Sequence, residues 1–525
     1  MNLESLPNEV LLTCFEYINA IDLFLTFDQL NFRFRQLIRT VRLSLDLYYV
    51  HKCQFHRLCQ TMLEIPEIKS QIHSLHLSNQ GTAGEIHAFL SLFSLEQFPN
   101  LHSLSLTSIR KHDVPHLQSM LPSLSKLTSF RLSRTRFDEQ ILRSLPTIHL
   151  RRLSLSKASR THYVLNLPQL RYLNIENIRC HFHVSVHLTT LILSQLMCRF
   201  DDLESYLSRA PALKHLTILA PKNRQLADAN CWQDLITKSL CQLQTFKFIF
   251  AGHSIEQYKK FQSDFWTIEH RWYTEYIQDG MLIYIYTISY PLNELILSAD
   301  FTRCKNPMIS DVDVFDNVTE LTLLMNFDVK TDEFYFNHIR SVILKIDGRI
   351  ALQHEQSAKT ITKMINLFNL KHICIHQEIC ADVVIELLRQ SPQLTSLSIS
   401  PQMLILFIRN RELCQYFTEK IRIFNIVPLL HPIFIGLKEL RNICSIFSNL
   451  VQFKCRVNTI EEIVIILQSL TKLTSLRTSL DHADVEEIFL TKVKEQRQQL
   501  NLSYTVEYED NDNDVLCFWI DREPK

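Results

Sequence analysis

The sequence predicts an α/β fold in which a long array of strand-and-helix repeats follows a small helical segment. Three observations carry this expectation. A leucine-rich phrase recurs along most of the chain, helix-like segments separate its copies, and residues 1–40 do not contain the phrase. One strand and one helix cannot bury their own apolar faces, but stacked copies share a continuous core, so the repeats are expected to fold as one array.

The repeated phrase has the form L-x-x-L-x-L, and its copies begin mostly about 18 to 31 residues apart. Alternate residues of a strand share one face. The fourth and sixth positions, Leu104 and Leu106 for example, are therefore expected to point into the core, while the third, fifth and seventh face outward. The copies begin at Ile72, Leu101, Leu127, Leu150, Leu170, Leu188, Leu213, Leu243, Leu292, Val318, Ile339, Leu370, Leu394, Leu450 and Leu473, with a weaker copy around Ile421. About fifteen strands at ~4.8 Å spacing predict one inner sheet about 70 Å long.

Short segments between the copies have apolar residues at i, i+3 and i+4 and are expected to be helices. They include residues 138–145, 201–210, 381–390 and 460–470. This pattern resembles the leucine-rich-repeat solenoid over about residues 41–525. In that family the ninth position usually holds Asn or Cys, which bonds to the turn backbone. Here that side-chain ladder is missing, because the position holds Gln80, Ile109, Thr135, Ala158, Ile178, Leu196 and Pro221.

Two segments depart from the repeat and are expected to form β-hairpins. Within about residues 265–290, two alternating aromatic runs flank Asp279-Gly280, and Asp-Gly between such runs is a strong hairpin signal. The second segment, about residues 500–522, is expected to cap the open end of the sheet.

Residues 1–40 predict three short helices, because Pro7 suits a first helical turn and Asp22 and Asn31 can cap two more. In the first helix, apolar side chains surround nearly the whole circumference, so it must be buried on more than one side. A segment of about 40 residues offers too little mass for that. Some of its surface is therefore expected to meet the first repeat or a partner protein.

The series Leu6-Pro7-x-Glu9-Val10-Leu11, Phe15, Asp22-Leu23, Leu30-Asn31 and Phe34 resembles the F-box, the adaptor-binding element of SCF ubiquitin ligases, over about residues 3–40. Cys14 stands where that family often has Ile, Asn31 where Cys or Ser is frequent, and Phe34 where Trp is common. The resemblance implies that the adaptor contacts Leu6, Pro7, Val10, Leu11, Cys14, Phe15, Ile18, Leu23, Leu30, Phe34 and Leu37. It also implies a cullin scaffold reached through the adaptor. The alternative is that residues 1–40 only cap the repeat array.

The composition excludes several classes of function. Glycine supplies only 6 of the 525 residues, against a usual share of about 7%. Phosphate-binding loops depend on glycine, which disfavours most nucleotide enzymes. The 55 basic and 55 acidic side chains cancel, which argues against a general nucleic-acid or anionic-membrane binder. The longest apolar stretch, residues 423–437, is broken by prolines and is shorter than the roughly 18 to 20 residues of a membrane span.

The expected compartment is the cytoplasm or the nucleus. The first ten residues carry Glu4 and Glu9 without a basic cluster, so no signal peptide is expected. The 14 cysteines include no Cys-x-x-Cys pair, and several, such as Cys14, Cys374 and Cys455, stand where an aliphatic residue would. That usage suits buried thiols in a reducing compartment.

The densest group of metal-ligand residue types is residues 180–187, where alternation places His181, His183, Ser185 and His187 on one face. An exposed connection with polar side chains outward is the simpler interpretation. The acidic residues of 510–514 resemble the start of a calcium loop, but Val515 holds the position that requires glycine. His354-Glu355 lacks the second His of a zinc-protease helix. We therefore expect no catalytic, cofactor or metal site, and no enzyme.

The outward face of the repeat strands is the best partner surface of such an array. Its charged and aromatic positions are the candidate contacts for a protein substrate. They are Arg131, Arg152, Tyr172, Glu176, His215, Lys247, His372, His376, Lys454, Arg456 and Arg477. The aromatic hairpin is a competing docking element. Two functions remain: a non-enzymatic substrate receptor of an SCF-type ligase, or a leucine-rich-repeat scaffold with no role in ubiquitination.

Overall fold

The computed structural model describes residues 3–28, 30–48, 50–80, 82, 84–156, 167–176, 185–298, 301–307, 309, 314–325, 334–346, 354–376, 379–427, 436–479, 503–509 and 515–521. The chain divides into two compact units. Unit 1 comprises Met1–Leu216 and Leu235–Gln244, and unit 2 comprises Thr217–Asp234 and Thr245–Lys525. Strand β8 (His215–Ala220) and helix α10 (Ala229–Ser239) cross the division.

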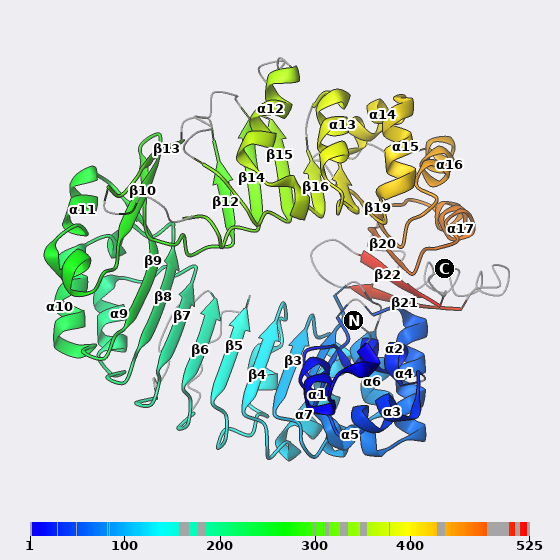
Figure 1. Ribbon diagram of the computed structural model, residues 1–525, viewed down its shortest axis with the longest axis horizontal. Helices are drawn as coiled ribbons and strands as arrows, with labels where there is room; N and C mark the ends of the chain where they lie inside the picture. Colours follow the sequence, from blue (N-terminus) through cyan, green and yellow to red (C-terminus); the bar gives the residue numbers. More distant parts are fainter. Residues whose placement is uncertain are drawn as a thin grey trace. The chain divides into compact units, whose positions relative to one another are not determined.

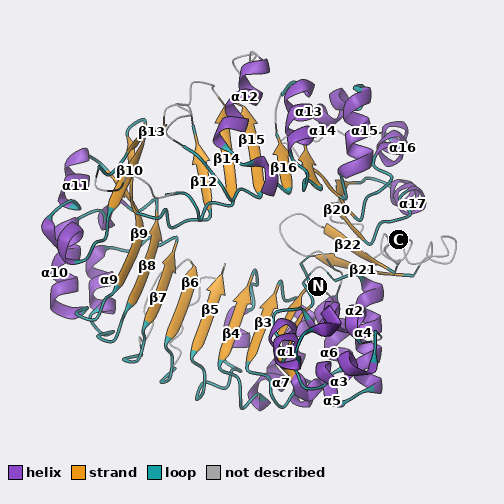
Figure 2. Ribbon diagram, viewed as in Figure 1, coloured by secondary structure: helices purple, strands orange, loops and turns teal. Residues whose placement is uncertain are grey.

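Unit 1 contains a parallel sheet whose strands follow one another in chain order (Figures 1 and 2). Its strands are β1 (Leu43–Asp46), β2 (Ile72–Ser78), β3 (Ser103–Thr107), β4 (Ser129–Ser133), β5 (Arg152–Ser156), β6 (Tyr172–Glu176) and β7 (Thr190–Ser194). Strand β1, which the repeat pattern did not predict, pairs in parallel with β2. Leu104 and Leu106 are fully buried, as expected for the fourth and sixth positions.

The helices of unit 1 are short, and they lie at the N-terminus and between the strands. They are η1 (Leu3–Ser5), α1 (Asn8–Phe15), α2 (Ala20–Phe27), α3 (Phe32–Ile38), α4 (Lys52–Glu64), α5 (Glu67–Gln71), α6 (Glu85–Leu92), η2 (Leu95–Gln97), η3 (Lys111–Asp113), α7 (Val114–Met120), η4 (Leu121–Ser123), α8 (Asp138–Leu142) and α9 (Phe200–Leu207). The three N-terminal helices and the helices expected within 138–145 and 201–210 are therefore present.

Unit 2 holds the remaining strands. They are β9 (Thr245–Gly252), β10 (Thr274–Asp279), β11 (Leu282–Thr287), β12 (Glu294–Leu297), β13 (Phe301–Cys304), β14 (Glu320–Met325), β15 (Ser341–Ile346), β16 (His372–Ile375), β17 (Ser396–Ile399), β18 (Ile423–Ile426), β19 (Gln452–Arg456), β20 (Ser475–Ser479), β21 (Tyr504–Glu509) and β22 (Val515–Ile520). From β12 to β20 the paired strands are parallel.

Helices α12 to α17 follow one another along one side of this parallel sheet (Figure 1). The helical elements of unit 2 are η5 (Arg224–Leu226), α11 (Ile255–Lys260), η6 (Phe265–Glu269), α12 (His354–Met364), η8 (Leu367–Asn369), α13 (Ala381–Gln390), α14 (Pro401–Phe407), α15 (Arg411–Lys420), α16 (Leu437–Ile446) and α17 (Ile460–Ser469). The apolar faces of α12 to α17 and the inward residues of β12 to β20 belong to one continuous core.

The expectation of one uninterrupted inner sheet is wrong, and the first hairpin is the reason. Strands β10 and β11 pair antiparallel around Gly280, which takes a left-handed φ of 56°. Strand β11 also pairs antiparallel with β9, from Tyr286↔Ile249 to Ile283↔Gly252. The hairpin thus occupies an edge of β9 that a following repeat strand would use, and β12 begins a second sheet.

The C-terminal hairpin covers the last strand of that second sheet. Strands β21 and β22 are antiparallel, and β22 pairs antiparallel with β20, where Phe518 lies opposite Leu476. Every residue of β22 is buried. The hairpin therefore removes the exposed edge that β20 would otherwise present, as the sequence predicted.

Backbone hydrogen bonds join successive repeats at the second position of the phrase. The Arg340 carbonyl, for example, accepts from the N–H groups of both Lys371 (2.9 Å) and His372 (3.0 Å). The same two-donor arrangement recurs at the carbonyls of His102, Thr128, Arg151, Arg171 and Thr189 in unit 1, and of Asn293, Thr319, Lys371, Thr395, Arg422 and Val451 in unit 2. This ladder uses no side chain, so it tolerates any residue at that position.

The turns after the strands are closed without the side-chain ladder at the ninth position. In unit 1 the N–H of Ser108 donates to the Ser133 carbonyl at 3.0 Å, and that of Arg134 donates to the Ser156 carbonyl at 3.2 Å. Both residues, like Gln195, have a left-handed φ between 52° and 56°. Left-handed turns usually favour glycine. Their occupation by larger residues is consistent with the scarcity of glycine in the chain.

Buried carboxylates close other turns. Glu85 accepts from the backbone N–H of Ser78 at 3.0 Å, and Glu462 accepts from that of Asn458 at 2.7 Å. Burial raises the pKa of Glu85 well above its usual value. A buried amide, Asn79, accepts from the Ile86 N–H and donates to the Ser108 carbonyl. This Asn lies one position before the ninth, which is why the family pattern did not identify it.

A buried ion pair fastens the first hairpin to β13. Both Nε and Nη2 of Arg303 lie 2.8 Å from Oε2 of Glu275, and the two side chains are only 10% and 1% exposed. The Tyr286 hydroxyl donates to the same carboxylate at 3.1 Å, and the Asn306 N–H donates to its other oxygen. The Arg303 guanidinium also stacks over Phe315, with 5.0 Å between its carbon and the ring centroid.

Arg303→Met should destabilise unit 2 by about 3 to 5 kcal/mol, because it leaves the Glu275 carboxylate buried without its cation. Urea unfolding followed by circular dichroism measures the change. The matched control is Lys305→Met, which removes an exposed cation two residues away. Equal unfolding midpoints for the two variants would contradict the role assigned to the pair.

Candidate functional site

The N-terminal helices form a small module with its own aromatic centre. The rings of Phe15, Phe27 and Phe34 lie 5.3 to 6.1 Å apart between centroids. Asn31 caps α3 by accepting from the Phe34 N–H at 2.9 Å. Each helix thus contributes one aromatic side chain to the same cluster.

Five of the eleven residues expected to contact an adaptor are buried inside unit 1. They are Leu11, Phe15, Leu23, Phe34 and Leu37, none more than 8% exposed. Their apolar character is used to pack the helices together, so they are not available to a partner in this conformation. Leu6 and Ile18 are half-buried, and the exposed members are Pro7, Val10, Cys14 and Leu30.

We use the name docking stripe for the exposed apolar side chains of the module. Pro7, Val10 and Cys14 follow one another at i, i+3 and i+7, so they share one side of α1. Beyond these, the stripe includes Leu3, Tyr17, Leu30 and Phe32, which are 42%, 87%, 59% and 75% exposed. The residues selected from the sequence did not include Leu3, Tyr17 and Phe32, because periodicity alone does not say which side of a helix faces its neighbours.

Hydrogen bonds bring the start of α3 against η1 and the start of α1. Arg33 donates through Nε to the Asn8 amide oxygen at 2.9 Å and through Nη2 to the Leu6 carbonyl at 2.5 Å. The Asn31 amide donates to the Glu4 carboxylate at 2.8 Å. These contacts hold Leu30 and Phe32, the neighbours of Asn31, close to the first residues of the stripe.

The module is also fixed to the first repeat. Asn19 and Asp46 of β1 are joined by two hydrogen bonds, one to the Asp46 carbonyl at 2.9 Å and one from its N–H at 3.0 Å. The Gln71 amide donates to the carbonyls of Ile38 and Val41. The helices therefore do cap the start of the array, with the docking stripe on surface that this capping leaves exposed.

The substrate candidates of unit 1 lie on the outward face of the sheet. Arg131 and Arg152 are exposed on the neighbouring strands β4 and β5, and His215 is exposed at the start of β8. The Arg152 guanidinium carbon lies 5.3 Å from the Tyr172 ring centroid, a cation–π contact between β5 and β6. Glu176 accepts from the Gln195 amide at 2.9 Å.

The substrate candidates of unit 2 divide into a histidine group and a basic group. His372 bonds to the Ser396 hydroxyl at 2.8 Å, and His376 lies 3.3 Å from the Cys374 thiol. Burial lowers the pKa of His372, and burial together with Lys345 lowers that of His376. The basic group comprises exposed Lys454 and Arg456 on β19 and half-buried Arg477 on β20, and Lys247 is half-buried on β9.

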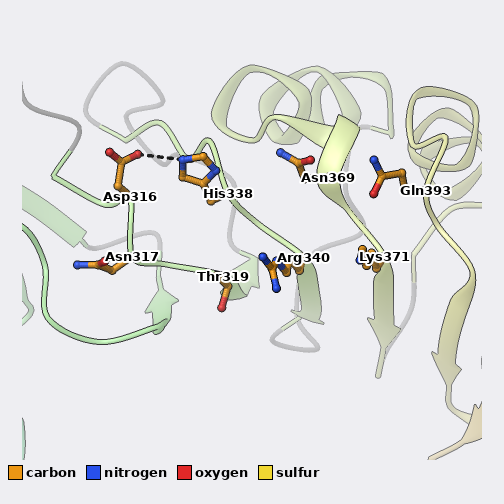
Figure 3. A pocket seen from close by; sticks show the side chains of 8 residues that line it. All are labelled: Asp316, Asn317, Thr319, His338, Arg340, Asn369, Lys371 and Gln393. Atoms are coloured by element: carbon orange, nitrogen blue, oxygen red, sulfur yellow. Dashed lines mark ion pairs between the residues drawn. The ribbon is translucent and has the colours of Figure 1, made fainter. Parts of the chain in front are cut away.

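A polar groove of about 450 Å³ lies at the starts of the strands in unit 2. Figure 3 shows Thr319, Arg340 and Lys371 in a row, each just before its own strand, with an ion pair of 3.5 Å between Asp316 and His338. The remaining lining residues are Asn317, Asn369 and Gln393.

Arg340 and Lys371 are the groove's two exposed long-chain cations, and neither forms an ion pair among the residues that the structure describes. They occupy the second position of the phrase, whose backbone carries the ladder while the side chain remains available. Sequence reasoning did not select them, since second positions are not on the outward face of a strand. Their alignment follows from the parallel register of β14, β15 and β16.

Some of the residues singled out from the sequence lie outside the described ranges. His181, His183 and residues 510–514 lie outside the described residues, as do the side chains of His354 and Glu355. His187 is exposed and Ser185 is half-buried.

Each described cysteine is a free thiol. No helix within the described ranges is both long enough and apolar enough to cross a membrane.

No protein-family model and no curated protein matches the chain. Among solved structures, the yeast Rad7 and Elc1 complex is similar at 11% identity and a TM-score of 0.30, over 72% of this chain and 84% of that one. The TLR13–ssRNA13 complex follows at 14% and 0.20, and the Drosophila Toll–Spatzle complex at 11% and 0.15. The TLR13 and Toll matches each cover 74% of this chain, but only 44% of the TLR13 chain and 42% of the Toll chain. Likeness at these scores indicates neither a partner nor a function.

The half-buried His372 of unit 2 predicts a stability that falls with acidification. The unfolded chain protonates His372 near pH 6.5, whereas the folded chain, with its lowered pKa, does so only at lower pH. Unfolding therefore takes up a proton between these two values, and stability is lost as pH falls through that window. His372→Gln should reduce the drop in the urea midpoint between pH 7.5 and pH 5.5. Exposed His253, replaced by Gln, is the control, and equal drops in both variants would refute the assignment.

Proposed function

We propose that this protein is a non-enzymatic substrate-recognition subunit of an SCF-type ubiquitin ligase. The N-terminal module binds the adaptor, and through it a cullin scaffold, while the repeats hold a protein substrate. The observation that carries the proposal is the docking stripe: Val10, Leu30 and Phe32 remain exposed although the module already has a complete core and is anchored to the first repeat.

Several exposed apolar side chains on one small module favour a protein partner, since exposed apolar patches often mark interaction surfaces. The partner class comes from the F-box resemblance of residues 3–40. Burying Val10, Leu30 and Phe32 gains about 1.5 to 3 kcal/mol for each fully buried side chain. Part of this gain offsets the loss of translational and rotational freedom, which leaves a stable complex within reach.

Phe32→Asp combined with Val10→Asp should weaken binding to the purified SCF adaptor by at least about thirtyfold, since loss of central apolar contacts typically costs about 2 kcal/mol or more. Surface plasmon resonance with the full chain measures the change. Substitution of Leu11 or Phe15 is a poor test, because both side chains are buried and their replacement would disrupt the module itself.

The matched control is Ile148→Asp, which introduces the same charge at an apolar side chain of unit 1 that is 69% exposed and outside the module. It should bind the adaptor like the unchanged protein. The proposal would be overturned if the unchanged chain does not bind the adaptor. It would also be overturned if the double variant and the control bind the adaptor with equal affinity.

Cargo recognition is assigned to the repeats, with the groove of unit 2 as the first candidate. Arg340 and Lys371 offer two exposed positive charges along its row, which favours an acidic segment of the substrate protein. The protein would act in the cytoplasm or the nucleus, and the transfer of ubiquitin would be performed by a separate enzyme brought close by the complex.

The alternative function is a scaffold that uses the same module without directing degradation. Proximity labelling in cells separates the two. For a receptor, Val10→Asp with Phe32→Asp should leave the labelled cargo unchanged but lower its ubiquitination and raise its abundance. For a scaffold, neither quantity changes. Deletion of residues 1–40 is unsuitable, since it would uncover β1.

Arg340→Glu with Lys371→Glu provides the complementary variant. It should reduce labelling of the cargo while the adaptor remains bound, because the changed residues lie in unit 2 and not in the module. Cargo labelling that is insensitive to this change would exclude the groove as the binding site.

A further inference from the structure

A group of metal-ligand side chains lies on the repeats of unit 1, away from the docking stripe and from the outward face of the sheet. It consists of His87 on α6 and of His112 and Asp113 on η3. One ligand atom from each lies within 4.8 Å of the others. His87 and His112 are exposed, and their ring centroids are 5.2 Å apart.

The two carboxylate oxygens of Asp113 differ in their hydrogen bonds. Its Oδ2 accepts from the Arg110 N–H and from the Asn79 amide, both at 3.1 Å. Its Oδ1 accepts no hydrogen bond, although the side chain is fully buried. A buried carboxylate oxygen without a hydrogen bond is costly. The exposed His112 imidazole lies beside it only at 3.5 Å, and a metal ion between the two groups would satisfy both.

The spacing of this oxygen to the nearest imidazole fits a shared metal ion. Nε2 of His112 lies 3.5 Å from Oδ1 of Asp113. Two ligands at 2.0 to 2.2 Å from one tetrahedral zinc ion are separated by about 3.4 Å. A direct hydrogen bond, by contrast, would be shorter.

The geometry points to a binding site for a divalent transition-metal ion of the zinc class, held by His87, His112 and Asp113. Imidazole nitrogens with one carboxylate select zinc-like ions over calcium or magnesium, which take oxygen ligands. The fourth position is filled by water or by His116 of α7, whose ring centroid is 6.0 Å from that of His87.

The ion would join two consecutive repeats, since α6 follows β2 while η3 follows β3. Asn79, which orients the Asp113 carboxylate, also bonds to the backbone at Ile86 and Ser108. The carboxylate is thus held in place by the same turn contacts that close the repeats. This site is independent of the proposed ubiquitin-ligase role.

The test uses the full chain, freed of metal with a chelator and titrated with zinc sulfate by calorimetry. The unchanged protein should bind one more zinc ion than the double variant His87→Ala with His112→Ala, or should bind that ion at least about tenfold more tightly. The reason is that even the loss of a residue that only supports a metal ligand typically lowers metal affinity about 10- to 100-fold. Both side chains are exposed, so their removal should leave the fold intact. His149→Ala, which removes another exposed histidine of unit 1, should behave like the unchanged protein.

Cobalt(II) gives a second readout. The unchanged protein should show the visible absorption of a tetrahedral cobalt site, and the double variant should lose it. Asp113→Asn, which can keep the hydrogen bonds of Oδ2 through its amide oxygen, should weaken cobalt binding. Equal zinc stoichiometry, affinity and cobalt spectra in the unchanged protein and the double variant would overturn the site and leave a simple His112–Asp113 ion pair.

Discussion

Both units depend on one backbone interaction. At the second position of each repeated phrase, the carbonyl accepts hydrogen bonds from two N–H groups of the next repeat. They fix each strand to the next before any side chain is considered, and they recur where the residue is His, Thr, Arg, Lys, Asn or Val. Backbone groups buried between repeats must be paired. This ladder pairs them without the asparagine that the leucine-rich-repeat pattern supplies, and the buried carboxylates of Glu85 and Glu462 close turns that the ladder does not reach.

A backbone ladder has a functional consequence, because it leaves the side chains of the second position available. In parallel register these side chains form a row, and in unit 2 the row presents Thr319, Arg340 and Lys371 along one groove. The outward strand positions form further rows, such as the contact of Arg152 with Tyr172. These rows of side chains therefore arise from alignment between repeats and not from any local motif.

The features that the sequence predicted are those with local signals. Leucine spacing located the strands, and Asp279-Gly280 located the first hairpin. The break between the sheets could not be predicted, because it depends on the pairing of β11 with β9 across the chain. The same holds for His87 and Asp113, which are adjacent only after two repeats stack, and for the groove. In the N-terminal module the motif identified the apolar residues, but only packing separates buried Leu11 from exposed Val10.

That separation also shows how residues 1–40 can cap the array and still keep an exposed apolar surface. One side of the module supplies the bonds of Asn19 to Asp46, while the docking stripe stays exposed. A partner on the stripe would therefore be coupled to β1 through a packed aromatic centre and not through a flexible linker. Under the proposed function, such coupling would give a bound adaptor a defined direction relative to the first strands of unit 1. Capping and an exposed apolar stripe therefore belong to one segment, which is the arrangement that the proposed docking requires.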